Sequence, residues 1–252
     1  MRDEIIKKLS ELEKTENITI LYAAESGSRA WGFESPDSDY DVRFIYINEK
    51  NHYLRIDKTR DVIEIPIDEV LDINGWDLNK ALRLLHSSNP TLFEWCNSSI
   101  VYKTTPYFEM VKENINEFFK PRACLYHYLN MAGNNYREYL RRDMVKAKKY
   151  FYVIRPILAC KWILENNCPP PMLFSELCEA MLDKELKPTI EELLEIKVNM
   201  LEVGEIPRIE VLNKYIEENL VSLKEKIDSI EVKESKGYDR LNELFLQALE
   251  IE

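Results

Sequence analysis

The segment from Ser26 to Asp41 constrains the fold of this chain more than any other. It joins a turn of small residues around Gly27 to two aspartates, Asp39 and Asp41, and apolar runs flank it on both sides. The pattern predicts a strand, a turn with a short helix or loop, and a second strand that opens with the aspartates. Side chains two residues apart on a strand share a face, so both carboxylates are expected side by side. Such like charges favour a bound cation, and Mg²⁺ or Mn²⁺ commonly also takes oxygens from a substrate phosphate.

The same segment resembles the signature of the DNA polymerase β superfamily of nucleotidyltransferases, in which Gly-Ser precedes Asp-x-Asp at the start of a strand. A longer form, Gly-Ser-x-Ala-Trp-Gly followed by Ser-Asp-x-Asp-x-Arg, is similar to a narrower bacterial and phage branch of predicted nucleotidyltransferases linked to RNA repair. An acidic turn between two strands is the alternative interpretation, and the Gly-Ser half of the motif disfavours it. The chain matches the longer form at Gly27, Ser28, Ala30, Trp31, Gly32, Ser38, Asp39, Asp41 and Arg43.

This resemblance implies transfer of a nucleotide from ATP or another NTP to an acceptor hydroxyl, with release of pyrophosphate. Asp39 and Asp41 would supply the ligands of the metal. Gly27 would let the backbone approach the phosphates without a clashing Cβ, and Ser28 would add a hydroxyl. Arg43 shares the face of the acids, where it would either neutralise them and approach phosphate or serve as a simple ion-pair partner.

A third carboxylate is usual in the superfamily, and three residues compete for the role. Asp72 and Glu64 each lie in an apolar, strand-like run, and Asp77 precedes a predicted helix. The resemblance favours Asp72, which lies a few residues before an aromatic-acid-Leu-x-x-Lys run. The alternative for Glu64 is that its side chain points from the strand into solvent. The alternative for Asp77 is that it serves as the N-cap of the helix. We rank Asp72 first, Glu64 second and Asp77 last.

Three residues in the second half of the chain are predicted to bind the nucleotide. Lys148, Tyr152 and Arg155 follow a spacing of i, i+4 and i+7, which places them on one helical face. The branch has a similar Lys-x-x-x-His/Tyr-x-x-Arg pattern. Lys148 and Arg155 would hold the triphosphate and Tyr152 would stack on a base or bond a phosphate. The alternative is a basic surface face.

The pattern of apolar residues changes near residue 105. Before it, helical and strand patterns alternate: an amphipathic helix over 2–14, strands over 18–24, 42–47, 62–67 and 70–73, and a helix over 78–86. After it, helical periodicity dominates up to residue 251, with Pro156 expected to kink or split one helix. This division matches the resemblance, which implies an α+β catalytic domain with a small mixed sheet over 1–105. An all-α domain over 106–252 is expected to close the nucleotide cleft.

Composition limits the remaining possibilities. The net charge of −11 argues against a broadly basic nucleic-acid-binding surface but leaves room for a local basic groove. No apolar run approaches the roughly 20 residues that span a bilayer, and the N-terminus lacks the apolar core of a signal peptide. The five cysteines show no metal-binding spacing, which favours free buried thiols in a cytoplasmic protein.

The predicted function is an Mg²⁺-dependent nucleotidyltransferase. The acceptor would be an RNA end, a protein side chain or a small molecule, and the link of the branch to RNA repair favours RNA. The alternative is a nucleotide-binding regulatory module or toxin-neutralising partner with little turnover. Asp39 and Asp41 together favour the enzyme, because a pure binding module does not need both.

Overall fold

The computed structural model describes residues 1–65, 70–199, 204–231 and 236–250. Its backbone forms two compact units, which we call the sheet unit and the helical unit. The sheet unit contains residues 1–30 and 39–118 together with the last helix. The helical unit contains residues 31–38 and the helices that lie between Phe118 and the last helix. The segment 31–38 therefore lies in the helical unit although the sheet unit holds the residues on both sides of it.

A mixed five-stranded sheet forms the centre of the sheet unit, which confirms the predicted α+β fold with a small mixed sheet. Its strand order is β3-β4-β2-β1-β5. β2 and β4 are parallel, and the other neighbours are antiparallel. The strands are β1 (Ile18–Glu25), β2 (Tyr40–Asn48), β3 (Val62–Glu64), β4 (Leu71–Asp77) and β5 (Val101–Thr104).

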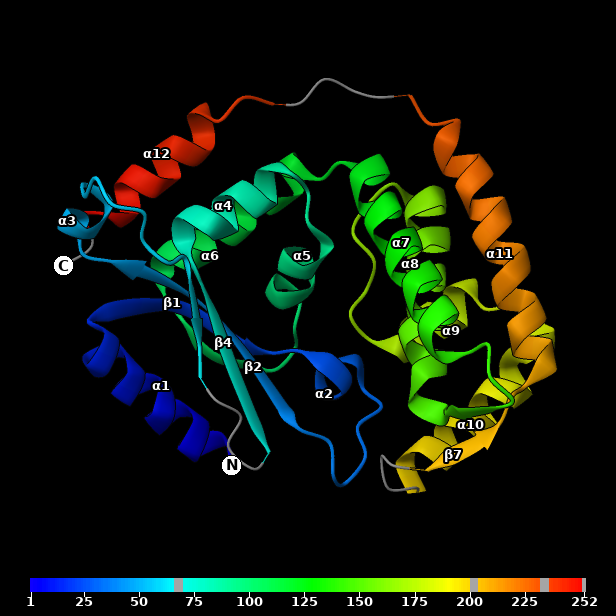
Figure 1. Cartoon of the computed structure of the whole chain (residues 1–252). Coiled ribbons are helices and arrows are strands. Elements are labelled where there is room, and N and C mark those ends of the chain that lie inside the picture. The colour runs from blue at the N-terminus through cyan, green and yellow to red at the C-terminus, as the bar shows by residue number, and fades with distance from the viewer. Residues whose placement is uncertain (66–69, 200–203, 232–235, 251–252) are drawn as a thin grey trace. The chain divides into compact units, whose positions relative to one another are not determined.

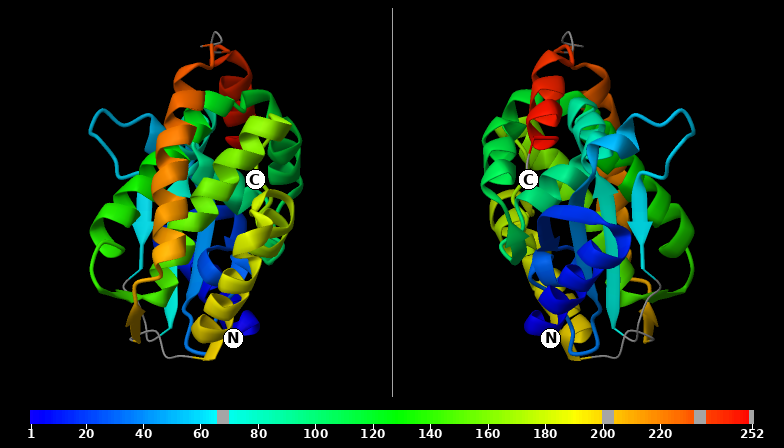
Figure 2. Two further views of the ribbon diagram at one scale, coloured as in Figure 1. Left: turned by 90° about the vertical axis from the view of Figure 1, so that its right-hand side faces the viewer. Right: turned by 90° about the vertical axis from the view of Figure 1, so that its left-hand side faces the viewer.

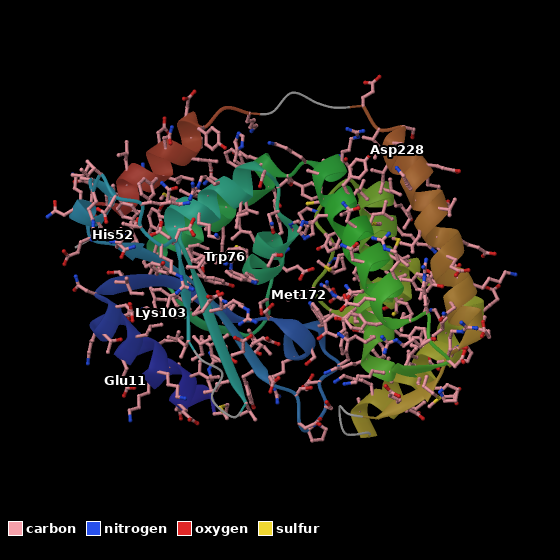
Figure 3. The ribbon with its side chains drawn as sticks, in the orientation of Figure 1. Glu11, His52, Trp76, Lys103, Met172 and Asp228 are labelled. Atoms are coloured by element: carbon pink, nitrogen blue, oxygen red, sulfur yellow. The ribbon has the colours of Figure 1, made fainter. Side chains whose placement is uncertain are left out.

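Helices cover both faces of this sheet (Figure 1). On one face, α1 (Arg2–Glu16) buries Ile5 and Leu9 in a core with apolar residues of β1, β2 and β4. The other face carries α4 (Leu78–His86), α5 (Pro90–Cys96) and α6 (Pro106–Asn114). There Trp76 of β4, labelled in Figure 3, lies 3.8 Å from Trp95 of α5 between ring centroids. The near-continuous apolar run of β1 suits a strand buried on both faces.

The first unit extends beyond the predicted boundary at residue 105. The ring of Phe108 in α6 stacks on Tyr22 of β1 at 4.5 Å, and η1 (Ile115–Phe118) follows α6. The last helix, α12 (Asp239–Ala248), packs against α4, and Tyr107 donates a hydrogen bond to the Leu244 carbonyl at 2.6 Å. Helical periodicity shows that these segments bury an apolar face, but it does not show which core receives that face.

The helical unit is built around three long helices. α7 (Pro121–Tyr139) packs along α8 (Ala147–Asn166), and α11 (Glu210–Asp228) packs against both (Figure 2). The unit also contains α9 (Phe174–Met181), η2 (Lys184–Leu186) and α10 (Lys187–Asn199). Pro156 does not split the predicted helix, because α8 runs through it without interruption.

The expectation of an all-α second domain needs one correction. β6 (Met144–Lys146) and β7 (Glu205–Pro207) form a two-stranded antiparallel sheet there. We predicted helix from Met144 onward, and the paired strand of β6 occupies that position instead. Strands this short carry too few residues to show an alternating pattern.

Several smaller predictions can also be compared with the structure. β3 lies at the edge of the sheet, and residues 66 and 67 of the strand predicted over 62–67 lie outside the described residues. All five cysteines are free thiols, and Cys96, Cys124 and Cys160 are buried. No helix in the described part of the chain has the length and apolar character needed to cross a membrane.

Asp77 serves as the cap of α4, as its alternative interpretation predicted. It is 3% exposed, and its Oδ1 accepts a hydrogen bond from the Asn79 backbone N–H at 2.8 Å. Its Oδ2 accepts from the Tyr53 hydroxyl at 2.7 Å and from the Asn48 side-chain amide at 2.9 Å. Burial raises the pKa of Asp77, and these hydrogen bonds act in the opposite direction.

We therefore predict that Asp77→Ala destabilises the protein. Loss of the cap and of two further hydrogen bonds should lower the free energy of unfolding by about 2–4 kcal/mol. Urea denaturation measures this change. The control is Asp57→Ala, which removes an acid that is 59% exposed and paired with Arg55, and it should leave the stability nearly unchanged. Equal stabilities of the two variants would contradict the assignment of Asp77 as a structural cap.

Candidate active site

The turn between β1 and β2 brings Gly27 against Asp41. β1 ends at Glu25, α2 (Gly27–Trp31) follows, and the Ser26 N–H donates a hydrogen bond to the Asp41 carbonyl at 2.8 Å. Gly27 has a φ of +60°, which side chains disfavour, and a Cβ at this position would lie 2.0 Å from Asp41 Oδ2. Glycine is therefore required here both by the backbone conformation and by the carboxylate of Asp41.

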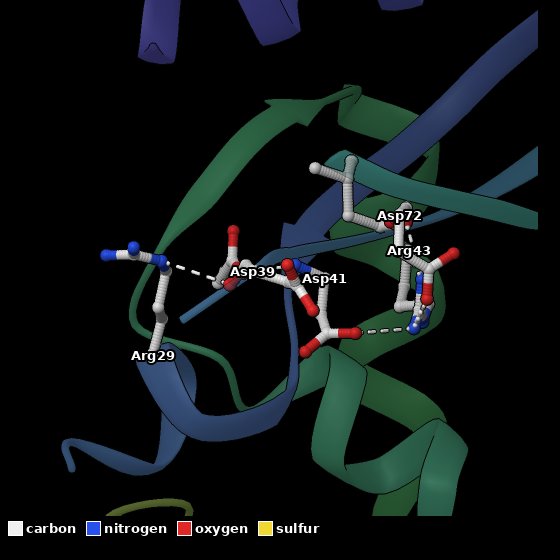
Figure 4. Close-up of polar contacts among 7 residues, drawn as sticks. Arg29, Asp39, Asp41, Arg43 and Asp72 are labelled. Atoms are coloured by element: carbon white, nitrogen blue, oxygen red, sulfur yellow. Dashed lines mark hydrogen bonds and ion pairs between the residues drawn. The ribbon is translucent and has the colours of Figure 1, made fainter. Parts of the chain in front are cut away.

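Asp41 and Asp72 lie side by side in the sheet, joined by Arg43 (Figure 4). They are paired residues of the parallel strands β2 and β4. Arg43 Nη2 donates to Asp41 Oδ1 at 2.8 Å and to Asp72 Oδ2 at 2.7 Å, and Arg43 Nη1 donates to the Asp72 carbonyl at 2.9 Å. Burial raises the pKa of Asp41; Arg43 lowers it, and the charges of Asp72 and Asp39 raise it further.

Asp39 comes immediately before β2 and is exposed. Its backbone carbonyl accepts a hydrogen bond from Arg29 Nε at 3.1 Å, as Figure 4 shows. The guanidinium of Arg29 lies 3.8 Å from the centroid of the Tyr40 ring. Arg29 thus holds the backbone of Asp39 from α2, next to Ser28, which is half-buried in the first turn of that helix.

The donor set of Asp39 and Asp41 suits a magnesium ion. Mg²⁺ is usually bound by one or two carboxylates and completes its shell with water and substrate phosphate oxygens. Asp41 is paired with Asp72 in the sheet and lies two residues from Asp39, and neighbouring carboxylates of this kind favour a bound cation. The described residues contain no ready-made cluster of three or more His, Cys, Asp or Glu ligands.

The other two candidates for the third acid lie elsewhere in the sheet unit. Glu64 is exposed on the edge strand β3, opposite Asn74, and forms an ion pair with Arg60. Asp77 caps α4, as described above. Of the three candidates, Asp72 is the one that neighbours Asp41, and its catalytic role stays a prediction.

The three predicted residues of the helical unit all lie on α8, but they have different surroundings. Lys148 lines a surface cavity that neither Tyr152 nor Arg155 lines. The ring of Tyr152 meets Trp31 edge-on at 5.7 Å. Arg155 is 2% exposed, its guanidinium lies 4.6 Å from the Trp31 ring, and it donates to the Met172 carbonyl at 3.2 Å. Arg155 therefore does not lie on a basic surface face, which was the alternative interpretation. A contact with nucleotide stays a prediction for all three residues.

Sequence reasoning missed the residues that hold segment 31–38 within the helical unit. Phe33 packs on Phe151 of α8 and Phe174 of α9, with centroids 4.9 and 5.4 Å apart. Lys197 of α10 is 6% exposed and donates to Ser35 Oγ at 3.0 Å and Ser38 Oγ at 3.3 Å. One signal was available in the sequence. Lys197 falls at i+7 from Ile190 and i+4 from Leu193, where the amphipathic pattern places an apolar residue.

Glu25 is a second residue that the sequence did not single out. It is fully buried at the end of β1, where its Oε1 accepts a hydrogen bond from the Asp41 N–H at 2.7 Å. The hydroxyl of Tyr102 donates to its other oxygen. Burial raises the pKa of Glu25, while both hydrogen bonds lower it. The backbone of Asp41 is thus held through its N–H by Glu25 and through its carbonyl by Ser26.

We predict that Gly27→Ala destabilises the site. A side chain at this φ costs about 1–2 kcal/mol, and the new Cβ must also displace the Asp41 carboxylate. The free energy of unfolding should fall by at least that amount in urea denaturation. Gly133→Ala is the matched control, because a Cβ there meets no heavy atom closer than 4.0 Å and alanine favours the helix. A fully stable Gly27→Ala protein would show that Gly27 and Asp41 are not packed together.

Comparison with known proteins identifies the family of this chain. Residues 1–247 match the family described as the RNA repair pathway DNA polymerase beta family. The uncharacterized protein YcgL of Bacillus subtilis (strain 168) is 46% identical over 252 residues, covering 99% of this chain and 97% of that protein. A nucleotidyltransferase-like protein from Exiguobacterium sibiricum 255-15 aligns with a TM-score of 0.32 and 13% identity, over 89% of this chain and 75% of that one. The match over nearly the whole length places the chain in the RNA repair pathway branch of the DNA polymerase β family of nucleotidyltransferases.

Proposed function

We propose that the protein transfers a nucleoside monophosphate from an NTP to an acceptor hydroxyl, with Mg²⁺ or Mn²⁺ as cofactor and pyrophosphate as the second product. The observation that carries this proposal is the arrangement of three aspartates at one end of the sheet. Asp41 of β2 is paired with Asp72 of β4, and Asp39 lies just before β2. Gly27 lies against Asp41. This is the acid set that nucleotidyl transfer needs.

Each part of this arrangement has a task. Asp39 and Asp41 hold the metal, which when bound neutralises charge on the phosphate oxygens. The turn at Gly27 and Ser28 receives the phosphates through its backbone amides and the serine hydroxyl. Because Glu25 and Ser26 fix the backbone of Asp41 on both sides, its carboxylate is held in place before the substrate arrives.

Asp72 is proposed as the base that takes the proton of the attacking hydroxyl. Arg43 binds Asp72 Oδ2, so Asp72 Oδ1 is the oxygen that can accept this proton. The acceptor oxygen then bonds to the α-phosphorus as the bond from the α-phosphorus to the bridging oxygen breaks, and pyrophosphate leaves with that electron pair. Arg43 keeps both carboxylates in position and offsets part of their repulsion.

The residues of α8 are proposed to assist nucleotide binding in two ways. Lys148 offers a cation to phosphate, and the exposed part of Tyr152 offers an aromatic surface. Arg155 already bonds the Met172 carbonyl and lies on Trp31, so we infer that it acts by positioning Trp31, which ends the helix that begins at Gly27.

Incubation with each α-labelled NTP, Mg²⁺ and a total cell extract tests the reaction and shows which class of acceptor becomes labelled. Wild-type protein should label RNA or another acceptor, and Asp41→Asn should not. Metal-dependent NTP binding without any labelled product would instead support the alternative, a nucleotide-binding regulatory or toxin-neutralising partner.

We predict that metal and NTP bind together at the aspartates. Isothermal titration should show Mg²⁺-dependent NTP binding to the wild type and a loss of at least tenfold in Asp41→Asn, because one charged ligand is removed. Asp61→Asn is the control, since Asp61 is partly exposed and pairs with Lys80 and Arg83 in the same unit. Equal affinities of wild type and Asp41→Asn would remove Asp41 from the metal site.

A separate prediction concerns the base. Asp72→Asn should lower turnover by about a hundredfold or more while NTP binding changes little, in line with general-base contributions. Glu64→Gln alters an exposed acid on the same sheet and should stay active. Single-turnover kinetics with labelled NTP measures both variants. The opposite result, an active Asp72→Asn and an inactive Glu64→Gln, would reverse our ranking of the third acid.

A further inference from the structure

The helical unit contains a basic cavity that is separate from the aspartates of the sheet unit. It has a volume of about 450 Å³, within the range of roughly 300–1,000 Å³ typical of ligand sites. It lies where the end of α7, strand β6 and the first turn of α8 meet, and β7 contributes Glu205. Its cationic lining residues are Arg142, Lys146, Lys148 and Lys149.

The charge of this cavity is opposite to that of the whole chain. Four cationic side chains and two glutamates, Glu138 and Glu205, line it, so its charge is four minus two, or +2, in a protein of net charge −11. A concave surface with positive charge raises the local concentration of anions, even on an acidic protein. The N-terminus of α8 carries the partial positive charge of the helix dipole, and no acidic residue in its first turn offsets it. The cavity is therefore suited to an anionic ligand.

Aromatic rings lie among the cations. Tyr139 lines the cavity, and Lys149 Nζ lies 3.7 Å from the centroid of its ring and 5.3 Å from that of Tyr152. A positive groove with aromatic surfaces is the combination that binds single-stranded nucleic acid, because the cations follow the phosphates and the rings stack on bases.

We propose that this cavity binds the phosphodiester backbone of a single-stranded polynucleotide acceptor. This inference rests on the proposed nucleotidyl transfer and names the acceptor class. Arg142 precedes β6, Lys146 lies on β6, and Lys148 and Lys149 lie in the first turn of α8. Cations from several elements suit a chain of singly charged phosphates. The two glutamates of the lining disfavour the denser charge of a triphosphate within the cavity. Lys148 is therefore shared between the two proposed ligands, and the rest of the lining is assigned to the polynucleotide.

Fluorescence anisotropy with a short, labelled single-stranded oligonucleotide tests this proposal, in RNA and DNA arms. The full-length protein is used in EDTA without NTP, so that the aspartates and their metal take no part. The double variant Arg142→Ala/Lys146→Ala removes two exposed cations of the lining and leaves α8 intact. The matched control is Lys214→Ala/Lys224→Ala, which removes two exposed lysines of α11 in the same unit.

We expect the cavity variant to bind the RNA oligonucleotide at least about tenfold more weakly, and the control to bind like wild type. The slope of log affinity against log salt should also fall by about 1.4, at about 0.7 per lost phosphate contact. Stronger binding of RNA than of DNA supports recognition of the 2′-hydroxyl in addition to the backbone, and equal binding supports recognition of the backbone alone.

Three outcomes would overturn the proposal: no oligonucleotide binding by wild type, equal binding by wild type and the cavity variant, or displacement of the oligonucleotide by free ATP at the same site. None of these outcomes would affect nucleotidyl transfer measured with Mg²⁺. A failure of the cavity can therefore be distinguished from a failure of the proposed reaction.

Discussion

The packing of the Asp41 carboxylate against the bare α-carbon of Gly27 is the constraint on which the rest of the site depends. It fixes where β1 must end and how the chain must turn before β2 begins. With Asp41 in that position, the parallel pairing of β2 and β4 brings Asp72 beside it, and repulsion between the two acids requires a cation. Arg43 supplies that charge within the fold, which leaves Asp39 exposed for a further cation.

The segment between the two halves of the motif connects the site to the helical unit. Gly27 and Asp41 lie in the sheet unit, whereas residues 31–38 lie in the helical unit. Phe33 and the buried Lys197 hold that segment by aromatic packing and by hydrogen bonds to two serines. Because Ser38 directly precedes Asp39, the hydrogen bond from Lys197 to Ser38 also holds the chain just before Asp39.

Charge is distributed unevenly over the molecule, and this distribution suits a nucleic-acid enzyme better than the total charge does. A net charge of −11 would repel a polynucleotide from most of the surface. The basic cavity around Lys146 and Arg142 would provide a local site for the proposed polynucleotide in the helical unit. Such localisation would favour binding of the polynucleotide at this cavity over non-specific binding, because the acidic surface elsewhere repels its phosphates.

The sequence by itself determined the motif, most of the strands and helices and the capping alternative for Asp77, because these depend on local periodicity and on residues close together in the chain. The mixed sheet followed from the family resemblance that the motif carries. Tertiary structure decided that α6 and α12 belong to the sheet unit, since periodicity does not identify the partner of an apolar face. It also decided the surroundings of Asp72, Arg155 and Lys197. Residues far apart in sequence, such as Lys197 and Ser35, meet only when the whole chain folds, and a buried charge is stable only beside partners that distant segments supply.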